Sequence, residues 1–250
     1  MKPNRFQTPF FARETTKMAP RRKGLGALTQ EDLELMLPLI GDDRIQKMRE
    51  ILSLRTQEVT MVMEGFSDPH NSSAVLRSCD AFGIQDAHVV EGPYSGKQGR
   101  PNKKVTRGVT RWLTVHQWGS TADALAAMKA QGRRICVAHV GGEKKLEQLD
   151  FLSPLCLWLG NEHYGPSQEL IEAADEIFEI PMVGFVESFN VSVAGALCLY
   201  TALAKRQAAG RNGDLTPAEQ ESLFRKWVFE DIRHGPSVLR ELRRRKTRNT

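Results

Sequence analysis

From residue 59 onward, short runs of β-branched and apolar residues alternate with longer segments whose apolar positions recur at helical spacing. The short runs predict strands at residues 59–65, 86–91, 112–117, 134–140, 155–160 and 176–181. The intervening and following segments predict helices near residues 72–82, 121–131, 167–174 and 191–206. This alternation is typical of a mainly parallel sheet covered on both faces, so we predict an α/β fold.

Helical patterns also flank the alternating region. Thr29 is a candidate cap for a helix over 30–39, and Asp43 for a second one. Farther on, Thr216 and Glu219 have the spacing of a capping box, and an apolar stripe typical of packing follows at Leu223, Phe224, Trp227 and Val228. We divide the chain into a basic arm expected to be disordered (1–28), a helical segment (29–55), an α/β domain (56–210) and a basic helical extension (211–250).

Charge is segregated along the chain more strongly than the net charge of +5 suggests. Residues 1–24 carry seven Lys and Arg against one acid, residues 97–111 six against none, and residues 225–250 nine against three. The net charges of these three stretches sum to +18, so the remaining residues together carry a net charge of −13. Three basic stretches around an acidic body indicate a polyanion-binding surface, although a basic tail taken alone is also typical of a solubilising segment.

Several classes of protein are disfavoured. The longest uncharged run, 188–204, has 17 residues and contains polar ones, so we expect a soluble protein without a membrane span. The first 30 residues lack an apolar core typical of a secretory signal, which leaves a disordered arm or a transit peptide. The four cysteines are widely spaced, so we expect reduced core thiols in a cytoplasmic protein, and no metal-ligand spacing is present.

Polar side chains gather in three segments that follow predicted strands, where parallel sheets bind ligands. The segments are 70-HNSSAVLRSCDAFG-83, 157-LWLGNEHYGPS-167 and 180-IPMVGFVESFNVSVAGA-196. Neither a dinucleotide-binding glycine motif nor a phosphate-binding P-loop is present, so any nucleotide-like ligand must be held in another way. In the third segment Asn190 is a candidate helix cap, but capping alone leaves Ser188 unexplained.

These three segments, in this order, resemble the motifs of the SPOUT class of RNA methyltransferases, in particular the TrmH-type tRNA 2′-O-methyltransferases. The resemblance runs from about Arg44 to Ala209, and its third motif is highly specific. Phe189 departs from the leucine usual in the family, and the residues flanking Glu162 also differ. The segments before Arg44 and after Asn212 are not covered well enough to identify the substrate.

The resemblance implies a fold whose C-terminal part is threaded into a deep trefoil knot, an exception to the usual topology rules. It also implies a homodimer and S-adenosylmethionine as cofactor, held largely by backbone at Ala138, Gly160, Ile180 and Phe189. No metal is expected, because the sulfonium is already a strong methyl donor. The small residues Ala194, Gly195 and Ala196 would let the last helix approach its neighbours closely.

By the same resemblance, Arg77 corresponds to the family's catalytic arginine, and Asn71, Glu162, Ser188 and Asn190 to its other site residues. An arginine side chain has a pKa above 12, so holding one neutral near pH 7 costs roughly 7 kcal/mol. We therefore favour Arg77 as an electrostatic stabiliser of the developing alkoxide over a literal base. The ordinary alternatives are an ion pair between Arg77 and Asp80, a surface acid at Glu162 and a simple cap at Asn190.

The predicted function is S-adenosylmethionine-dependent 2′-O-methylation of a ribose in structured RNA, with a D-loop guanosine of tRNA, position 18, as the favoured target. Ribosomal RNA is the enzymatic alternative, and a non-catalytic RNA-binding protein is the alternative from another class. Basic residues on the loop before the third strand are candidates for phosphate contacts, or for a merely solvated loop: Lys103, Lys104, Arg107 and Arg111.

Overall fold

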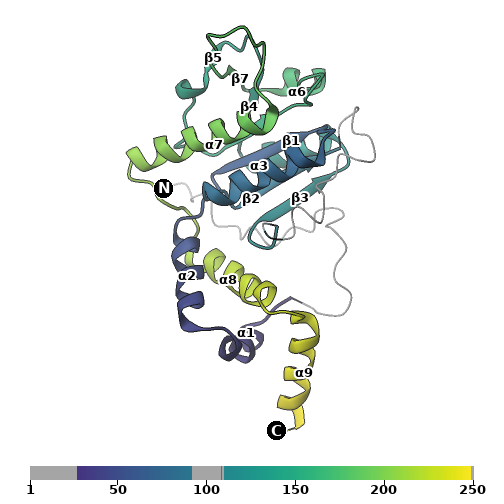
Figure 1. Cartoon of the computed structure of the whole chain (residues 1–250), viewed down its shortest axis with the longest axis vertical. Coiled ribbons are helices and arrows are strands. Elements are labelled where there is room, and N and C mark those ends of the chain that lie inside the picture. The colour runs from purple at the N-terminus through teal and green to yellow at the C-terminus, as the bar shows by residue number, and fades with distance from the viewer. Residues whose placement is uncertain (1–26, 92–107, 109, 249–250) are drawn as a thin grey trace, which may run out of the picture.

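The computed structural model describes residues 27–91, 108 and 110–248. Most of the predicted basic arm, as well as Lys103, Lys104 and Arg107, lies outside these residues. Within the described part, an α/β body stands above a group of helices built from both ends of that part (Figure 1). No helix there is long and apolar enough to cross a membrane.

The body is organised around one seven-stranded sheet in the order β3-β2-β1-β6-β4-β7-β5. All its strand pairs are parallel, as predicted. The strands are β1 (Val59–Glu64), β2 (Asp86–Val90), β3 (Thr114–Trp118), β4 (Arg134–Ala138), β5 (Lys144–Lys145), β6 (Leu155–Leu159) and β7 (Glu176–Glu179). The prediction missed β5, because two exposed lysines carry no apolar signal, and it placed the start of β3 two residues too early.

Helices cover both faces of the sheet, also as predicted. On one face, α3 (Pro69–Ala81) and α7 (Val191–Ala208) pack over a core that includes Val75, Leu159 and Cys198. On the other face, α5 (Thr121–Ala130) and α6 (Gln168–Ala173) cover a second core around Trp158. The four cysteines are buried and free, as expected.

The close approach of α7 to its neighbours depends on Gly195. A Cβ atom at that position would lie 3.1 Å from Leu159 Cδ1 and 3.2 Å from Val75 Cγ2. The expectation that small residues in this helix permit close packing is therefore confirmed at Gly195.

Two predicted helix starts were wrong. A helix predicted from about residue 72 makes Asn71 its candidate cap, but α3 begins at Pro69. Asp68 caps it by accepting a hydrogen bond from the backbone N–H of His70, and Asn71 lies inside the first turn. Gly41 precedes α2 (Asp42–Ser53), so Asp43 is a helical residue and not a cap. In both cases the helix extends farther toward its N-terminus than the apolar pattern indicated, because the added first-turn positions are polar. Asn190 does cap α7, as expected.

The two helical extensions, predicted as separate segments, form one helical lobe. It comprises α1 (Gln30–Met36), α2, α8 (Pro217–Asp231) and α9 (Gly235–Arg248) around a shared apolar cluster. The short 3₁₀ helix η1 (Leu37–Leu39) connects α1 to α2. The predicted stripe on α8 is buried in this cluster, and the capping box at Thr216 is present.

An ion pair fastens the last helix to the first. Asp32, whose side chain is 3% exposed, accepts hydrogen bonds of 2.7 and 2.6 Å from Arg243. The sequence 240–248 favours an end that faces only solvent or RNA, and this was wrong for Arg243, which packs against α1. The hydrogen bond from Arg243 lowers the pKa of Asp32 to about 2, against partial burial, which acts in the opposite direction.

This pair predicts an acid-sensitive contribution to stability. Because the folded-state pKa of Asp32 lies below its unfolded value of 3.8, the contribution is present above pH 4 and is lost as pH falls toward 2. We expect about 1–2 kcal/mol, since a shift of one unit is worth about 1.4 kcal/mol and solvent around the partly exposed Arg243 weakens the pair. Urea unfolding at pH 6 and pH 2.5 should show Asp32→Asn lacking this loss, while the exposed control Asp43→Asn on α2 keeps it. Equal acid sensitivity of Asp32→Asn and the unmodified chain would contradict the assignment.

Candidate functional site

Three loops at the carboxyl edge of the sheet meet around the side chain of Glu162. One loop leads from β1 into α3, the second follows β6, and the third leads from β7 into α7. The strands β1 and β6 are paired neighbours, and β4 separates β6 from β7. The three sequence segments are therefore brought to one edge because their strands are parallel and close together.

Glu162 accepts four hydrogen bonds from the loop before α3 and from its first turn. The donors are the backbone N–H and hydroxyl of Ser67, both at 2.9 Å, the backbone N–H of Asp68 at 3.2 Å and the amide of Asn71 at 3.0 Å. Partial burial alone would raise the pKa of Glu162, but hydrogen bonds from Asn71, Ser67 and Asp68 outweigh it and lower that pKa below its ordinary value. Glu162 is therefore a charged anchor between two of the loops.

Asn71 extends this network to the third loop. Its side-chain oxygen accepts a 3.2 Å hydrogen bond from Asn190 Nδ2, while its own amide donates to Glu162. Asn190 in turn caps α7, because its Oδ1 accepts from the backbone N–H and the hydroxyl of Ser192. The chain Glu162–Asn71–Asn190 thus joins all three predicted motifs, and Asn190 is a cap and a network member at once.

Sequence reasoning missed two buried polar residues that support these loops. Asn161, 6% exposed, donates 2.6 Å to the carbonyl of Gly65 and accepts from the backbone N–H groups of His163 and Tyr164. Glu64, 2% exposed at the end of β1, accepts from Thr121 on α5 and from Ser167, the cap of α6. A charged residue that ends an apolar strand was the only sequence signal for Glu64.

Three of the four positions expected to bind cofactor fall at the ends of adjacent strands, and the fourth, Phe189, lies in the loop directly before α7. Ala138 ends β4, Gly160 follows β6, and Ile180 follows β7. A pocket of about 410 Å³ opens beside the last of these, lined by Val140, Glu179, Ile180, Met182, Gly184, Val186 and Glu187. This volume falls within the roughly 300–1,000 Å³ typical of small-molecule sites.

Close backbone packing shapes this edge of the sheet. A Cβ atom at Gly160 would lie 2.2 Å from the backbone nitrogen of Pro166, so no larger residue fits without moving the loop. Glu179, which lines the pocket, accepts a 2.8 Å hydrogen bond from the backbone N–H of Gly141 and pairs with Lys145. The hydrogen bond from Lys145 lowers the pKa of Glu179.

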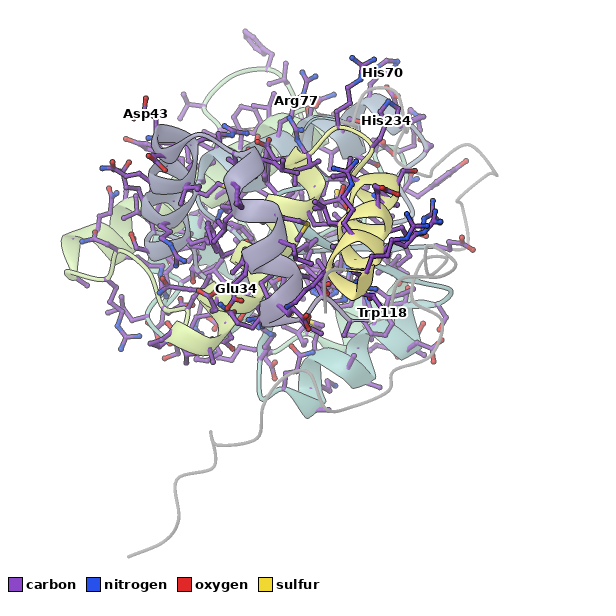
Figure 2. All side chains as sticks on the ribbon, turned by 90° about the horizontal axis from the view of Figure 1, so that it is seen from below. Glu34, Asp43, His70, Arg77, Trp118 and His234 are labelled. Carbon is purple, nitrogen blue, oxygen red and sulfur yellow. The ribbon has the colours of Figure 1, made fainter. Side chains whose placement is uncertain are left out.

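Arg77 and Ser188 lie outside the hydrogen-bonded network. Arg77 is exposed on α3 and makes no hydrogen bond or ion pair with any other described residue. Figure 2 labels Arg77, which lies in the upper part of that view. Ser188 is exposed in the loop before α7. The alternative of an ion pair between Arg77 and Asp80 does not hold, because Asp80 pairs with Arg55 instead.

Arg111 is the candidate RNA-binding residue that the structure describes. Its guanidinium lies 4.5 Å from the ring centroid of Trp112 and 3.8 Å from the carboxylate of Asp231 on α8, and 37% of its side chain is exposed. It therefore already contacts the helical lobe, and its role toward RNA stays a prediction. In the described part of the chain, no three His, Cys, Asp or Glu side chains are grouped so as to hold a metal ion.

Comparison with known proteins agrees with this arrangement. Residues 58–200 match the model of the SpoU rRNA Methylase family. A tRNA (guanosine(18)-2'-O)-methyltransferase of Escherichia coli (strain K12) is 36% identical over 208 residues, covering 81% of this chain and 86% of the relative. A 23S rRNA (guanosine-2'-O-)-methyltransferase of Vibrio parahaemolyticus is 32% identical over 162 residues, covering 64% of each.

Solved structures give the same answer for the fold. The TrmH/SpoU tRNA modifying enzyme of A. aeolicus superimposes with a TM-score of 0.68 and 30% identity, covering 77% of this chain and 98% of that one. The chain belongs to the SpoU rRNA methylase family.

The role of Glu162 as an anchor is testable. Glu162→Gln replaces one carboxylate oxygen with an amide that cannot accept a hydrogen bond, so donors that are partly buried lose a partner. We expect the free energy of unfolding to fall by about 1–2 kcal/mol. Hydrogen exchange of the Ser67 and Asp68 amides should accelerate. The exposed Glu169→Gln serves as the matched control and should change neither quantity. Unchanged exchange in Glu162→Gln would contradict the anchoring role.

Proposed function

We propose that this chain is an S-adenosylmethionine-dependent tRNA guanosine 2′-O-ribose methyltransferase. The observation that carries the proposal is the hydrogen-bonded chain Glu162–Asn71–Asn190, which fixes three loops beside a pocket while Arg77 remains an exposed, unpaired cation. The E. coli relative, which matches most of the chain, bears the name of a tRNA (guanosine(18)-2'-O)-methyltransferase.

The pocket fits the proposed cofactor in its chemistry. Its apolar walls, among them Val140, Ile180 and Val186, suit an adenine ring, and the carboxylate of Glu187 suits a cationic methionyl group. Gly160 supports the proposal because the backbone there is packed too closely for a side chain to intrude. Bound S-adenosylmethionine would supply a methyl group already activated by a positive sulfur, so no metal is required. Ala138 and Phe189 are the other proposed backbone contacts.

The chain's own contribution would be to align and stabilise. Asn71 and Asn190, held by Glu162, would set the position of the loop that faces the nucleotide, with Ser188 beside them. Arg77 stays cationic, because a guanidinium is charged at any physiological pH. It would stabilise the negative charge that develops on the ribose oxygen. In the transfer, the oxygen–carbon bond would form as the sulfur–methyl bond breaks, sulfur would keep the bonding electron pair as a neutral thioether, and the hydroxyl proton would pass to water. Alignment of the two reacting groups would supply most of the rate enhancement.

A tRNA substrate is favoured over ribosomal RNA by the extent of the match. The tRNA-directed relative is covered over 86% of its length, whereas the rRNA-directed one is covered over 64% and contains a further part that this alignment does not reach. The non-catalytic alternative is disfavoured because Arg77, Asn71, Glu162 and Asn190 are all present.

Substrate phosphates would bind the basic residues outside the α/β body. On α9, Arg240, Arg244 and Arg248 are exposed and recur every fourth residue, so they follow one side of the helix at intervals of about 6 Å. Arg243 faces α1 instead. We also propose phosphate contacts for Arg111, Lys103, Lys104 and Arg107, on the basis of their charge and their position in the sequence.

A homodimer is part of the proposal. On α7, Val193 and Tyr200 are 45% and 60% exposed and lie seven residues apart, hence on one face of the helix. Val183 and Phe185 in the preceding loop are fully exposed. Contact with a second copy would cover these apolar side chains, and sedimentation equilibrium should therefore report twice the mass of one chain rather than 28.1 kDa.

We further propose that the segment from β7 to α7 is threaded into a knot. Family membership and the packing of α7 beside α3 over the same core support this. Stretching single molecules tests it, since a knotted chain at full extension stays shorter than its residue count allows.

The catalytic assignment predicts a separation of turnover from binding. Arg77→Ala should reduce methyl transfer to a tRNA transcript by at least a hundredfold, as expected when a stabiliser of developing charge is removed, while calorimetry shows S-adenosylmethionine affinity within a few-fold of the original. The exposed Lys129→Ala on α5 should leave both unchanged. A large loss of cofactor affinity in Arg77→Ala would show that its role is misplaced. Tight tRNA binding without methyl transfer by the unmodified chain would favour the non-catalytic alternative, and preferential transfer to a 23S rRNA fragment the ribosomal one.

The phosphate surface predicts a change in salt dependence. Replacing Arg240, Arg244 and Arg248 with Gln should weaken tRNA binding and flatten the slope of log K against log salt by roughly two to three charges, because each phosphate contact releases counterions. Filter binding across 50–300 mM salt measures this slope, and Lys129→Gln is the control. An unchanged slope would exclude α9 from the interface.

A further inference from the structure

Arg55 is a buried charge at the junction of the α/β body and the helical lobe. It lies between α2 and β1 and is 1% exposed. Its Nη1 donates 3.0 Å to the backbone carbonyl of Ile84, and its Nη2 pairs with the carboxylate of Asp80, near the end of α3. Its guanidinium also lies 5.3 Å from the ring centroid of Trp227 on α8. One side chain therefore contacts the segment before β2, α3 and the helical lobe.

Stability alone gives a poor reason for a buried arginine here. Removing a guanidinium from water is costly, and a well-packed apolar residue of similar volume often serves equally well or better. The hydrogen-bonding capacity of Arg55 is not fully used, because its Nε is buried without a hydrogen-bond partner among the described residues. A functional role for the contact between Arg55 and Asp80 would explain why a charged residue occupies this buried position.

Asp80 lies three residues after Arg77 on α3, and this spacing ordinarily favours an ion pair along a helix. The structure has a different pairing: Asp80 bonds to Arg55, and Arg77 makes no ion pair in the described part of the chain. If Asp80 were free, its carboxylate would compete with the substrate for Arg77. A guanidinium already neutralised by a neighbouring carboxylate stabilises a developing alkoxide less well.

We infer that Arg55 is a positioning residue that sequesters Asp80 and thereby keeps Arg77 available to the reacting ribose. The inference rests on the proposed role of Arg77 and adds a residue that never contacts the substrate. It also gives the helical lobe a physical route to the site, since Trp227 of α8 packs on the same guanidinium that restrains Asp80.

The test is a rescue experiment. Arg55→Met retains much of the side-chain volume but releases Asp80, and kcat for tRNA methylation should fall by tenfold or more. In the double variant Arg55→Met, Asp80→Asn, the freed side chain can no longer form an ion pair with Arg77, so kcat should return to within about threefold of the original. Thermal unfolding of both variants separates this effect from loss of structure, because the second substitution rescues kcat without restoring the unfolding temperature.

Accessibility of Arg77 supplies a readout that is independent of activity. Phenylglyoxal, which modifies exposed guanidinium groups, followed by peptide mass spectrometry should label Arg77 in the unmodified chain, label it more slowly in Arg55→Met and label it at the original rate in the double variant. A double variant as inactive and as protected as Arg55→Met would overturn the inference, as would full activity of Arg55→Met. Absence of methyl transfer by the unmodified chain would instead count against the proposed function, and the labelling result would still decide the ion-pair exchange.

Discussion

A half-buried carboxylate with four hydrogen-bond donors around it is the interaction on which the site depends. Glu162 accepts from Ser67, Asp68 and Asn71, and Asn71 passes the connection to Asn190. Loops at the end of a parallel sheet have no ladder partners of their own, so their relative positions must be fixed by side chains. Here a single charge fixes two loops directly and a third through one amide. The positions of the three loops relative to one another are accordingly fixed, and Arg77 is left outside the network.

The helical lobe depends on a different kind of constraint. Its apolar cluster is assembled from α1, α2, α8 and α9, and the ion pair between Asp32 and Arg243 fixes the two outer helices together. Its connection to the α/β body runs partly through Arg55, which touches Trp227 and Asp80 at once. Binding of RNA to α9 and chemistry at α3 would therefore share a structural element, although they use separate surfaces.

The fold class, six of seven strands and the four main helices of the body were predictable because each has a periodic apolar pattern. The first residues of the helices were harder to predict. Asp68 and Gly41 precede helical turns that contain no periodic apolar residues. At the site, Asn71, Glu162 and Asn190 were found through motifs, but Asn161 and Glu64 were not, since nothing in one sequence marks a polar residue as buried. The joining of the two helical segments, and the partnership of Asp80 with Arg55 rather than Arg77, depend on contacts between residues distant in sequence.

The composition of the helical lobe bears on how the chain folds as it is synthesised. Figure 1 shows α1 and α2 beside α8, yet α8 begins only after the whole α/β body has been made. Translation proceeds at about 5–20 residues per second, so roughly ten to thirty seconds pass between the synthesis of α1 and α2 and that of α8. During that interval Leu33, Met36 and Leu52 have no core to enter, so the nascent chain exposes an apolar surface that chaperones would recognise until translation ends.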